Sequence, residues 1–231
     1  MKFTITRINR QNKLMVSTKT IDRFLERIAK DDAKQSVARF RMSVPLMEGD
    51  YQYYKGIREW QHVYPAAEFS KDESGNLVFQ KSNGLVILHF TNLMTNQEKD
   101  AAKTAASLLP MTFAAIEGAD GRSLIVLVNI SNEEGKIPTK EEEADLLYQS
   151  AYEQVKTLYQ AQVHATIKPE KPSLESNFML TMDASPYYNN KAVAMRIASN
   201  QFAVATAPKS IDDLKAYDDY EFLYRKASEA T

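Results

Sequence analysis

Apolar and polar residues alternate along the first part of the chain in a way that predicts a hairpin followed by a helix. Residues 2–8 alternate between the two kinds, and residues 14–17 supply a returning strand after a turn rich in asparagine. Apolar residues at helical spacing over 21–28 then predict a helix. Residues 37–45 favour a strand that ends at its proline.

The middle of the chain has the clearest pattern. A continuous apolar run that begins at Leu85 predicts a strand buried on both faces. Thr95 or Asn96 should cap the next helix, and Thr139 with Glu142 predicts a capping box at the start of a later one. The expected elements are strand 85–90, helix 92–108, strands 111–116 and 124–130, helix 139–159 and strand 177–182.

This β-α-β-β-α-β order is that of the RRM-like or ferredoxin-like unit, so we predict an α+β protein. In such a unit the first two strands run parallel, and the third lies antiparallel between them. We expect residues 1–231 to form a single domain, with an N-terminal α/β extension over 1–80 and a core sheet unit over 84–183. Residues 184–231 should form a loop and a C-terminal helix that begins at Ser210.

The predicted topology brings two remote segments to one edge of the sheet. His89 and Thr91 are two residues apart at the end of the first core strand, so they share one face. The turn over 117–122 should lie at the same edge, because the second core strand runs parallel to the first. This edge is therefore the candidate site.

Composition narrows the classes of function. The 29 basic and 30 acidic residues give a net charge of -1, without the basic excess typical of duplex-DNA binders. The chain has no cysteine, which excludes disulfides, thiolate zinc sites and cysteine nucleophiles. It has no apolar run of about 20 residues and no apolar leader, so we expect a cytoplasmic protein without membrane contact. Phosphate-binding glycine motifs are missing, so no cofactor is expected.

Four segments together resemble the VirE N-terminal domain family, which belongs to the archaeo-eukaryotic primase (primase-polymerase) superfamily. The segment over 44–47 is similar to the family's leucine-proline segment, and 84–93 to its glycine-led strand ending in Asp-x-Asp. The segment over 117–128 is similar to its serine- and glycine-rich segment, and 182–189 to its closing Asp-Pro-x-x-Tyr-x-Asn. The resemblance implies a primase-type core and a context of DNA replication or mobile elements.

The chain departs from this family at the residues that carry its chemistry. The two metal-binding aspartates of the family fall here on His89 and Thr91, and its phosphate-facing lysine falls on Ile125. An imidazole and a hydroxyl do not supply the charge that holds Mg²⁺ or Mn²⁺ against a triphosphate. The resemblance therefore implies a degenerate site with no catalytic residue and no metal. Its members are His89, Thr91, Glu117 and Asp120.

Binding of single-stranded nucleic acid would need a positive groove with aromatic rings for the bases. The candidate basic residues are Arg39, Arg41, Lys55, Arg58 and Arg122. The candidate stacking residues are Tyr51, Tyr53, Tyr54, Trp60, Tyr187 and Tyr188, although packing at the margin of the core is the more usual role of such rings.

The leading hypothesis is a catalytically degenerate accessory module that binds single-stranded DNA or a replication protein. One alternative is a protein-interaction module without nucleic-acid binding, which the near-neutral charge favours. A second alternative is a nucleotidyltransferase with a rewired metal site near His89, Glu117 and Asp120. The sequence leaves the oligomeric state open.

Overall fold

A computed structural model describes residues 1–9, 11–30, 34–44 and 60–198, and shows a mixed α/β protein. The helices of this part are α1 (Ile21–Lys30), α2 (Lys34–Ser43), α3 (Asn96–Ser107) and α4 (Glu141–Val163). The longer strands are β1 (Lys2–Ile8), β2 (Leu14–Thr20), β4 (Ala67–Lys71), β5 (Leu77–Ser82), β6 (Leu85–Thr91), β7 (Thr112–Glu117) and β8 (Leu124–Asn132). The short strands are β3 (His62–Tyr64), β9 (Thr166–Ile167), β10 (Phe178–Met179), β11 (Tyr187–Tyr188) and β12 (Met195–Ile197).

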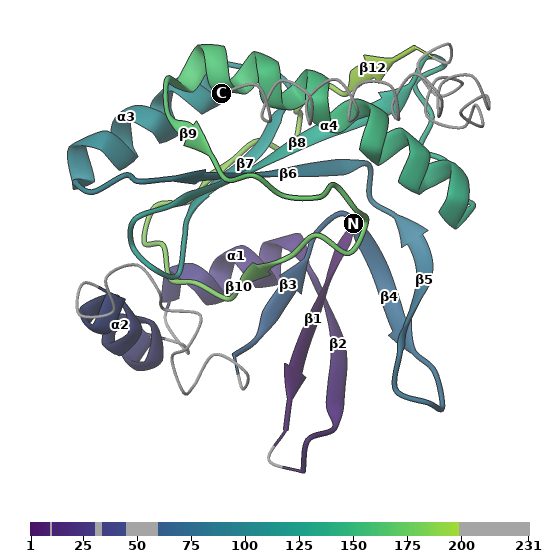
Figure 1. The fold of residues 1–231 in the computed structure, drawn as a ribbon, viewed down its shortest axis with the longest axis horizontal. Coiled ribbons are helices and arrows are strands. Elements are labelled where there is room, and N and C mark those ends of the chain that lie inside the picture. The colour runs from purple at the N-terminus through teal and green to yellow at the C-terminus, as the bar shows by residue number, and fades with distance from the viewer. Residues whose placement is uncertain (10, 31–33, 45–59, 199–231) are drawn as a thin grey trace, which may run out of the picture.

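The larger sheet has the strand order β11-β7-β8-β6-β9, and β12 runs parallel beside the end of β8. Strand β8 is antiparallel to both β6 and β7, so these two strands run parallel to each other with β8 between them. This is the arrangement that the sequence predicted for the first three core strands. Helices α3 and α4 cover one face of the sheet (Figure 1).

A second, smaller sheet lies across the other face of the larger one (Figure 1) and has the order β10-β3-β1-β2. Its outer strand β10 comes from late in the chain and pairs antiparallel with β3. The prediction that 177–182 closes the larger sheet is therefore wrong. The two-residue strand β9 takes the place beside β6 instead, directly after α4.

Strand β6 is buried on both faces, as its continuous apolar run predicted. Val86, Leu88 and Phe90 pack in one cluster with side chains of α3 and α4. Leu85 and Ile87 face the opposite way and pack with β1, α1 and β10. The pleat of the strand thus assigns its alternate residues to two separate cores.

The predicted strand over 37–45 is wrong where the structure describes it, because residues 34–43 form α2. The buried residues of this segment are Val37, Phe40 and Val44, which are spaced as on one face of a helix. The other apolar residues of the segment made this spacing hard to recognise in the sequence. Phe40 packs against Trp60, with 5.2 Å between the ring centroids. Contacts with other parts of the chain therefore decide the structure of this segment.

The capping box occurs at a different helix from the predicted one. Thr95 accepts a hydrogen bond from the backbone N–H of Glu98, whose carboxylate accepts one from the N–H of Thr95. The N-cap of α4 is Lys140, which makes no side-chain capping bond, so the box expected from Thr139 and Glu142 is not formed. The acidic first turn of α4 still complements its dipole.

The C-terminal helix predicted from Ser210 lies outside the described residues. Within the part of the chain that the structure describes, no helix combines the length and apolar character needed to cross a membrane.

Candidate functional site

The end of β6 lies beside a cavity of about 220 Å³ between the two sheets. His89 and Thr91 line it from the larger sheet, together with Asp120 from the turn after β7. His62 lines it from β3 of the smaller sheet. The structure thus brings together three of the four residues predicted at this edge, and we call this space the inter-sheet cavity. The fourth, Glu117, is held in an ion-pair network nearby.

His89 is oriented by a carboxylate that the sequence reading missed. Its Nδ1 lies 2.5 Å from Oε2 of Glu170, and Oε1 of Glu170 accepts a hydrogen bond of 2.8 Å from Lys168. Burial works against ionisation of Glu170, but hydrogen bonds and charge from His89 and Lys168 lower its pKa to about 2. An ionised carboxylate only accepts hydrogen bonds, so Nδ1 of His89 is the donor and Nε2 is left for other partners.

His62 is held in a comparable way on the opposite wall. Its Nδ1 lies 2.9 Å from the amide oxygen of Asn177, which is the residue before β10. His62, His89 and Asn177 all line the inter-sheet cavity. The two imidazoles therefore come from different sheets, and each is fixed through Nδ1.

The turn between β7 and β8 has little space for larger side chains. A Cβ atom at Gly118 would lie 1.9 Å from the hydroxyl of Ser123, so a larger residue there would displace the side chain of Ser123. Ser123 donates a hydrogen bond of 2.6 Å to Asp120, which also accepts one from the N–H of Arg122. Asp120 is thereby used to hold the turn.

Arg41 is a predicted nucleic-acid-binding residue whose guanidinium contacts the protein itself. It donates to the carbonyls of Gly118 (3.0 Å) and Met182 (2.8 Å), and lies 3.5 Å from the carboxylate of Glu117. Lys99 of α3 forms a second ion pair with Glu117 at 2.5 Å. Arg41 thus joins α2 to the turn after β7.

Asp183 completes this network and is only 3% exposed. Its Oδ2 accepts hydrogen bonds of 2.8 Å from Lys103 and from the N–H of Glu117, and its Oδ1 accepts one from the N–H of Ser185. Burial of a carboxylate without such hydrogen-bond partners would be costly in free energy. Asp183 lies in the segment over 182–189, which resembles the closing motif of the VirE N-terminal domain family. That resemblance was the one feature of the sequence that could have indicated a role for Asp183.

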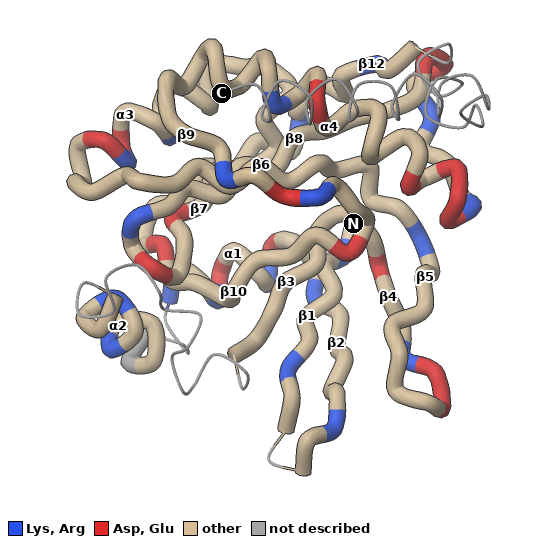
Figure 2. Tube along the Cα trace, in the orientation of Figure 1, with Lys and Arg blue, Asp and Glu red and all other residues tan. Residues whose placement is uncertain are grey.

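The other described basic candidates, and Lys168 beside the cavity, are more accessible than Arg41. Arg39 is exposed on α2, Arg122 is partly exposed beside the turn, and Lys168 is exposed on the segment that links β9 to β10. Figure 2 shows that this segment carries basic positions on either side of an acidic one. Lys55 and Arg58 lie outside the described residues.

The aromatic candidates that are described pack against the protein. Trp60 donates a hydrogen bond of 2.8 Å from its indole nitrogen to the carbonyl of Leu180. Tyr188 packs edge-on against Phe113, with 5.3 Å between the ring centroids, and Tyr187 packs against the core beneath α3 and α4. Tyr51, Tyr53 and Tyr54 lie outside the described residues.

A metal site would need several oxygen or nitrogen ligands in one place. Among residues 1–9, 11–30, 34–44 and 60–198, no three His, Asp or Glu side chains gather closely enough to hold an ion. The carboxylates of this region are instead paired with cations and hydrogen-bond donors.

Comparison with known proteins gives one result. A family model described as "BT4734-like, N-terminal domain" matches residues 56–188. This range begins before β3 and ends with β11, so it includes His62, His89 and Glu170. No curated protein and no solved structure matches the chain.

Proposed function

Because the chain belongs to the BT4734-like N-terminal domain family, which accounts for most of its described fold, we propose that it is an accessory module of primase-polymerase type that binds single-stranded nucleic acid without nucleotidyl transfer. The strand order β7-β8-β6-β9 supports this proposal, since it is the order of the ferredoxin-like unit that primase-type cores contain. The short β9 serves as the fourth strand of that unit.

The observation that carries the proposal is the state of His89. By the resemblance described under sequence analysis, His89 falls where the VirE N-terminal domain family has its first metal-binding aspartate, and its Nδ1 is bound to Glu170. An imidazole beside a threonine hydroxyl offers at most one good ligand, where two-metal chemistry needs several charged oxygen ligands. With Nδ1 donating to Glu170, Nε2 of His89 can accept a hydrogen bond from a sugar hydroxyl, or donate one to a phosphate oxygen when it carries a proton.

The size and polarity of the inter-sheet cavity favour part of a polymer as its ligand. Its volume of about 220 Å³ is below the range of roughly 300–1,000 Å³ that encloses whole organic ligands. The ammonium of Lys168 can donate to anionic oxygen, and the two imidazoles can do so when both of their ring nitrogens carry a proton. The carboxylates of Asp120 and Glu170 also line the cavity, so it offers donors for one phosphate and no more. One backbone phosphate or sugar of a strand fits this description better than a free nucleoside triphosphate.

Fluorescence anisotropy of a labelled single-stranded oligonucleotide, titrated with the protein, tests the proposal. We expect binding that weakens between about 50 and about 200 mM salt, because phosphate contacts release counterions. Addition of Mn²⁺ should leave the affinity unchanged. Replacing Lys168 or Arg39 by alanine should weaken binding about threefold each, with a lower salt slope.

Lys136 provides the matched control, because it is 75% exposed and lies after β8, at the opposite end of the larger sheet. Lys136→Ala should bind like the unaltered protein. Metal-dependent binding with nucleotide incorporation would instead support a rewired nucleotidyltransferase. Absence of oligonucleotide binding at every salt concentration would leave the protein-interaction module as the better hypothesis.

A further inference from the structure

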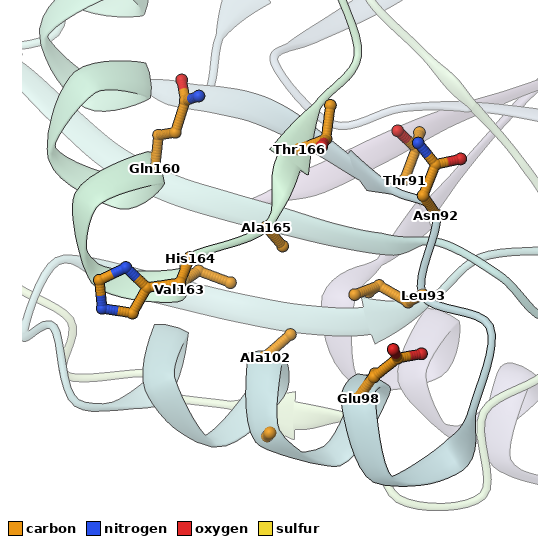
Figure 3. Close-up of a pocket in the computed structure, with 11 residues that line it drawn as sticks. Thr91, Asn92, Leu93, Glu98, Ala102, Gln160, Val163, His164, Ala165 and Thr166 are labelled. Atoms are coloured by element: carbon orange, nitrogen blue, oxygen red, sulfur yellow. The ribbon is translucent and has the colours of Figure 1, made fainter.

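A second and larger cavity lies on the opposite face of the larger sheet (Figure 3). Its volume is about 640 Å³, and it lies between the start of α3, the C-terminal end of α4 and the edge formed by β6 and β9. We call it the helix-side pocket. Its volume falls within the roughly 300–1,000 Å³ typical of sites that enclose small organic ligands.

The inner surface of the helix-side pocket is apolar. Leu93, Ala102 and Val163 line it and are 5%, 3% and 8% exposed, so they belong to the core beneath the helices. Ala101 and Ala165 also line it. Because three of these five residues are alanines, the helices and the sheet edge leave an open space that larger side chains would fill.

Five polar side chains surround this apolar surface. They are Thr91, Asn92, Gln160, His164 and Thr166. Figure 3 shows Thr91 and Asn92 at the end of β6 on one side, Gln160 and His164 at the end of α4 on the other, and Thr166 on β9, with the imidazole of His164 turned away from Leu93. Within the described part of the chain none of these side chains has a hydrogen-bond partner in the protein, so their donors and acceptors are available to a ligand.

The backbone fixes two of these side chains at opposite sides of the pocket. Asn92 and His164 both have left-handed conformations, with φ of 65° and 53°. At His164 this conformation ends α4, and its N–H donates to the carbonyl of Gln160. Asparagine and histidine tolerate the left-handed region better than most residues, so the chain can reverse there without glycine.

Charge decides which ligands suit the pocket. The lining residues include the carboxylate of Glu98 but no lysine or arginine. The negative dipole end of α4 and the positive dipole end of α3 both face this region and offset each other, so the carboxylate of Glu98 decides the sign of the charge. A phosphate or carboxylate is therefore disfavoured, and an uncharged or cationic ligand is favoured.

We propose that the helix-side pocket binds a small uncharged or cationic heterocycle of the nucleobase or nucleoside class. The flat face of such a ring would lie on Leu93 and Ala102, and its polar edge would meet the amides of Asn92 and Gln160. A free sugar has hydroxyls all around its ring and would leave some of them against the apolar surface, which the flat ring of a base does not. This inference does not depend on the proposed strand-binding function, because the pocket lies on the other face of the sheet.

Titration of the ¹⁵N-labelled protein with adenosine, guanosine, cytidine and uridine tests the inference by NMR. We expect saturable shifts for at least one nucleoside, centred on the backbone amides of Asn92, Gln160 and His164. The amides of His89 and Lys168 should shift less. The corresponding monophosphate should bind at least about fivefold more weakly, because its charge meets the carboxylate of Glu98 and finds no lysine or arginine among the lining residues.

Three variants examine the pocket without disturbing the core. Gln160→Leu removes an amide, Ala101→Leu narrows the space from an exposed helix position, and His164→Asn removes the imidazole while tolerating the left-handed backbone. Each should weaken nucleoside binding about fivefold, which corresponds to one hydrogen bond or an equivalent loss of contact. Glu142→Gln, in the first turn of α4, should bind like the unaltered protein.

Two results would overturn the inference. One is that no nucleoside produces saturable shifts at these amides, and the other is that the monophosphate binds as tightly as the nucleoside. Unfolding temperatures of the variants, measured in parallel, distinguish a variant that no longer binds nucleosides from one that no longer folds.

Discussion

At the scale of single residues, each buried or half-buried carboxylate near the candidate site is paired with cations or hydrogen-bond donors. Glu170 is 23% exposed and is bonded to both His89 and Lys168. Asp183 is almost fully buried and is bonded to Lys103 and two backbone N–H groups. These carboxylates act as fixed acceptors that position neighbouring groups, a role that the sequence pattern did not reveal.

The lowered pKa of Glu170 predicts how stability depends on pH. The folded pKa of about 2 lies below the ordinary value of 4.5, so ionised Glu170 stabilises the fold above pH 4.5. This contribution is lost as the pH falls towards 2, and we expect it to be on the order of 2 kcal/mol. Denaturant unfolding of Glu170→Gln should show a deficit at pH 6 that shrinks by pH 3.

Glu175→Gln is the matched control for that series, because Glu175 is exposed on the same segment between β9 and β10. Its difference from the unaltered protein should stay constant across the same pH range. A deficit of Glu170→Gln that does not change between pH 6 and pH 3 would contradict the assigned pKa.

Asp183→Asn should destabilise the protein strongly. The substitution leaves the ammonium of Lys103 without its carboxylate, and breaking a buried pair by removing one partner costs about 3 kcal/mol or more. Glu26→Gln breaks an exposed pair with Lys30 in α1 and should leave the unfolding free energy nearly unchanged. Equal effects of the two substitutions in urea unfolding would refute the structural role of Asp183.

At the scale of elements, local signals specified the helices and strands of the larger sheet better than they specified the boundaries. The continuous apolar runs and the Thr95 cap correctly indicated β6, α3, β7 and β8. The same signals failed for α2, whose buried face depends on Trp60 and other residues distant in sequence. They also failed at the start of α4, where a threonine stands at capping-box spacing but the helix begins one residue later.

Substitution of the two candidate N-cap threonines distinguishes the capping box observed at α3 from the one expected at α4. Thr95→Ala should lower the free energy of unfolding by about 1 kcal/mol, since it removes an N-cap acceptor. Thr139→Ala should have little effect, because no side-chain bond caps α4. Urea unfolding of the two variants provides the measurement, and a larger loss for Thr139→Ala would show that the box lies at α4 after all.

At the scale of the whole molecule, the candidate site depends on contacts between segments that are far apart in the chain. The inter-sheet cavity needs His62 from β3, His89 from β6 and Glu170 from the link between β9 and β10. The strand pattern predicted that β6 and the turn after β7 would meet, because parallel strands end at one edge. It could not predict that Glu170 would reach His89, since loop residues carry no periodic signal.

The pairing of β10 with β3 has a consequence for how the protein is made. Strand β3 has β1 on one side as soon as the N-terminal segments are synthesised, but Phe178 must emerge before its other side is covered. At about 5–20 residues per second, the nascent chain carries this unpaired strand edge for on the order of 10 s. The smaller sheet therefore cannot be completed on the ribosome before most of the chain has been translated, and its open edge is a place where chaperones would be expected to bind.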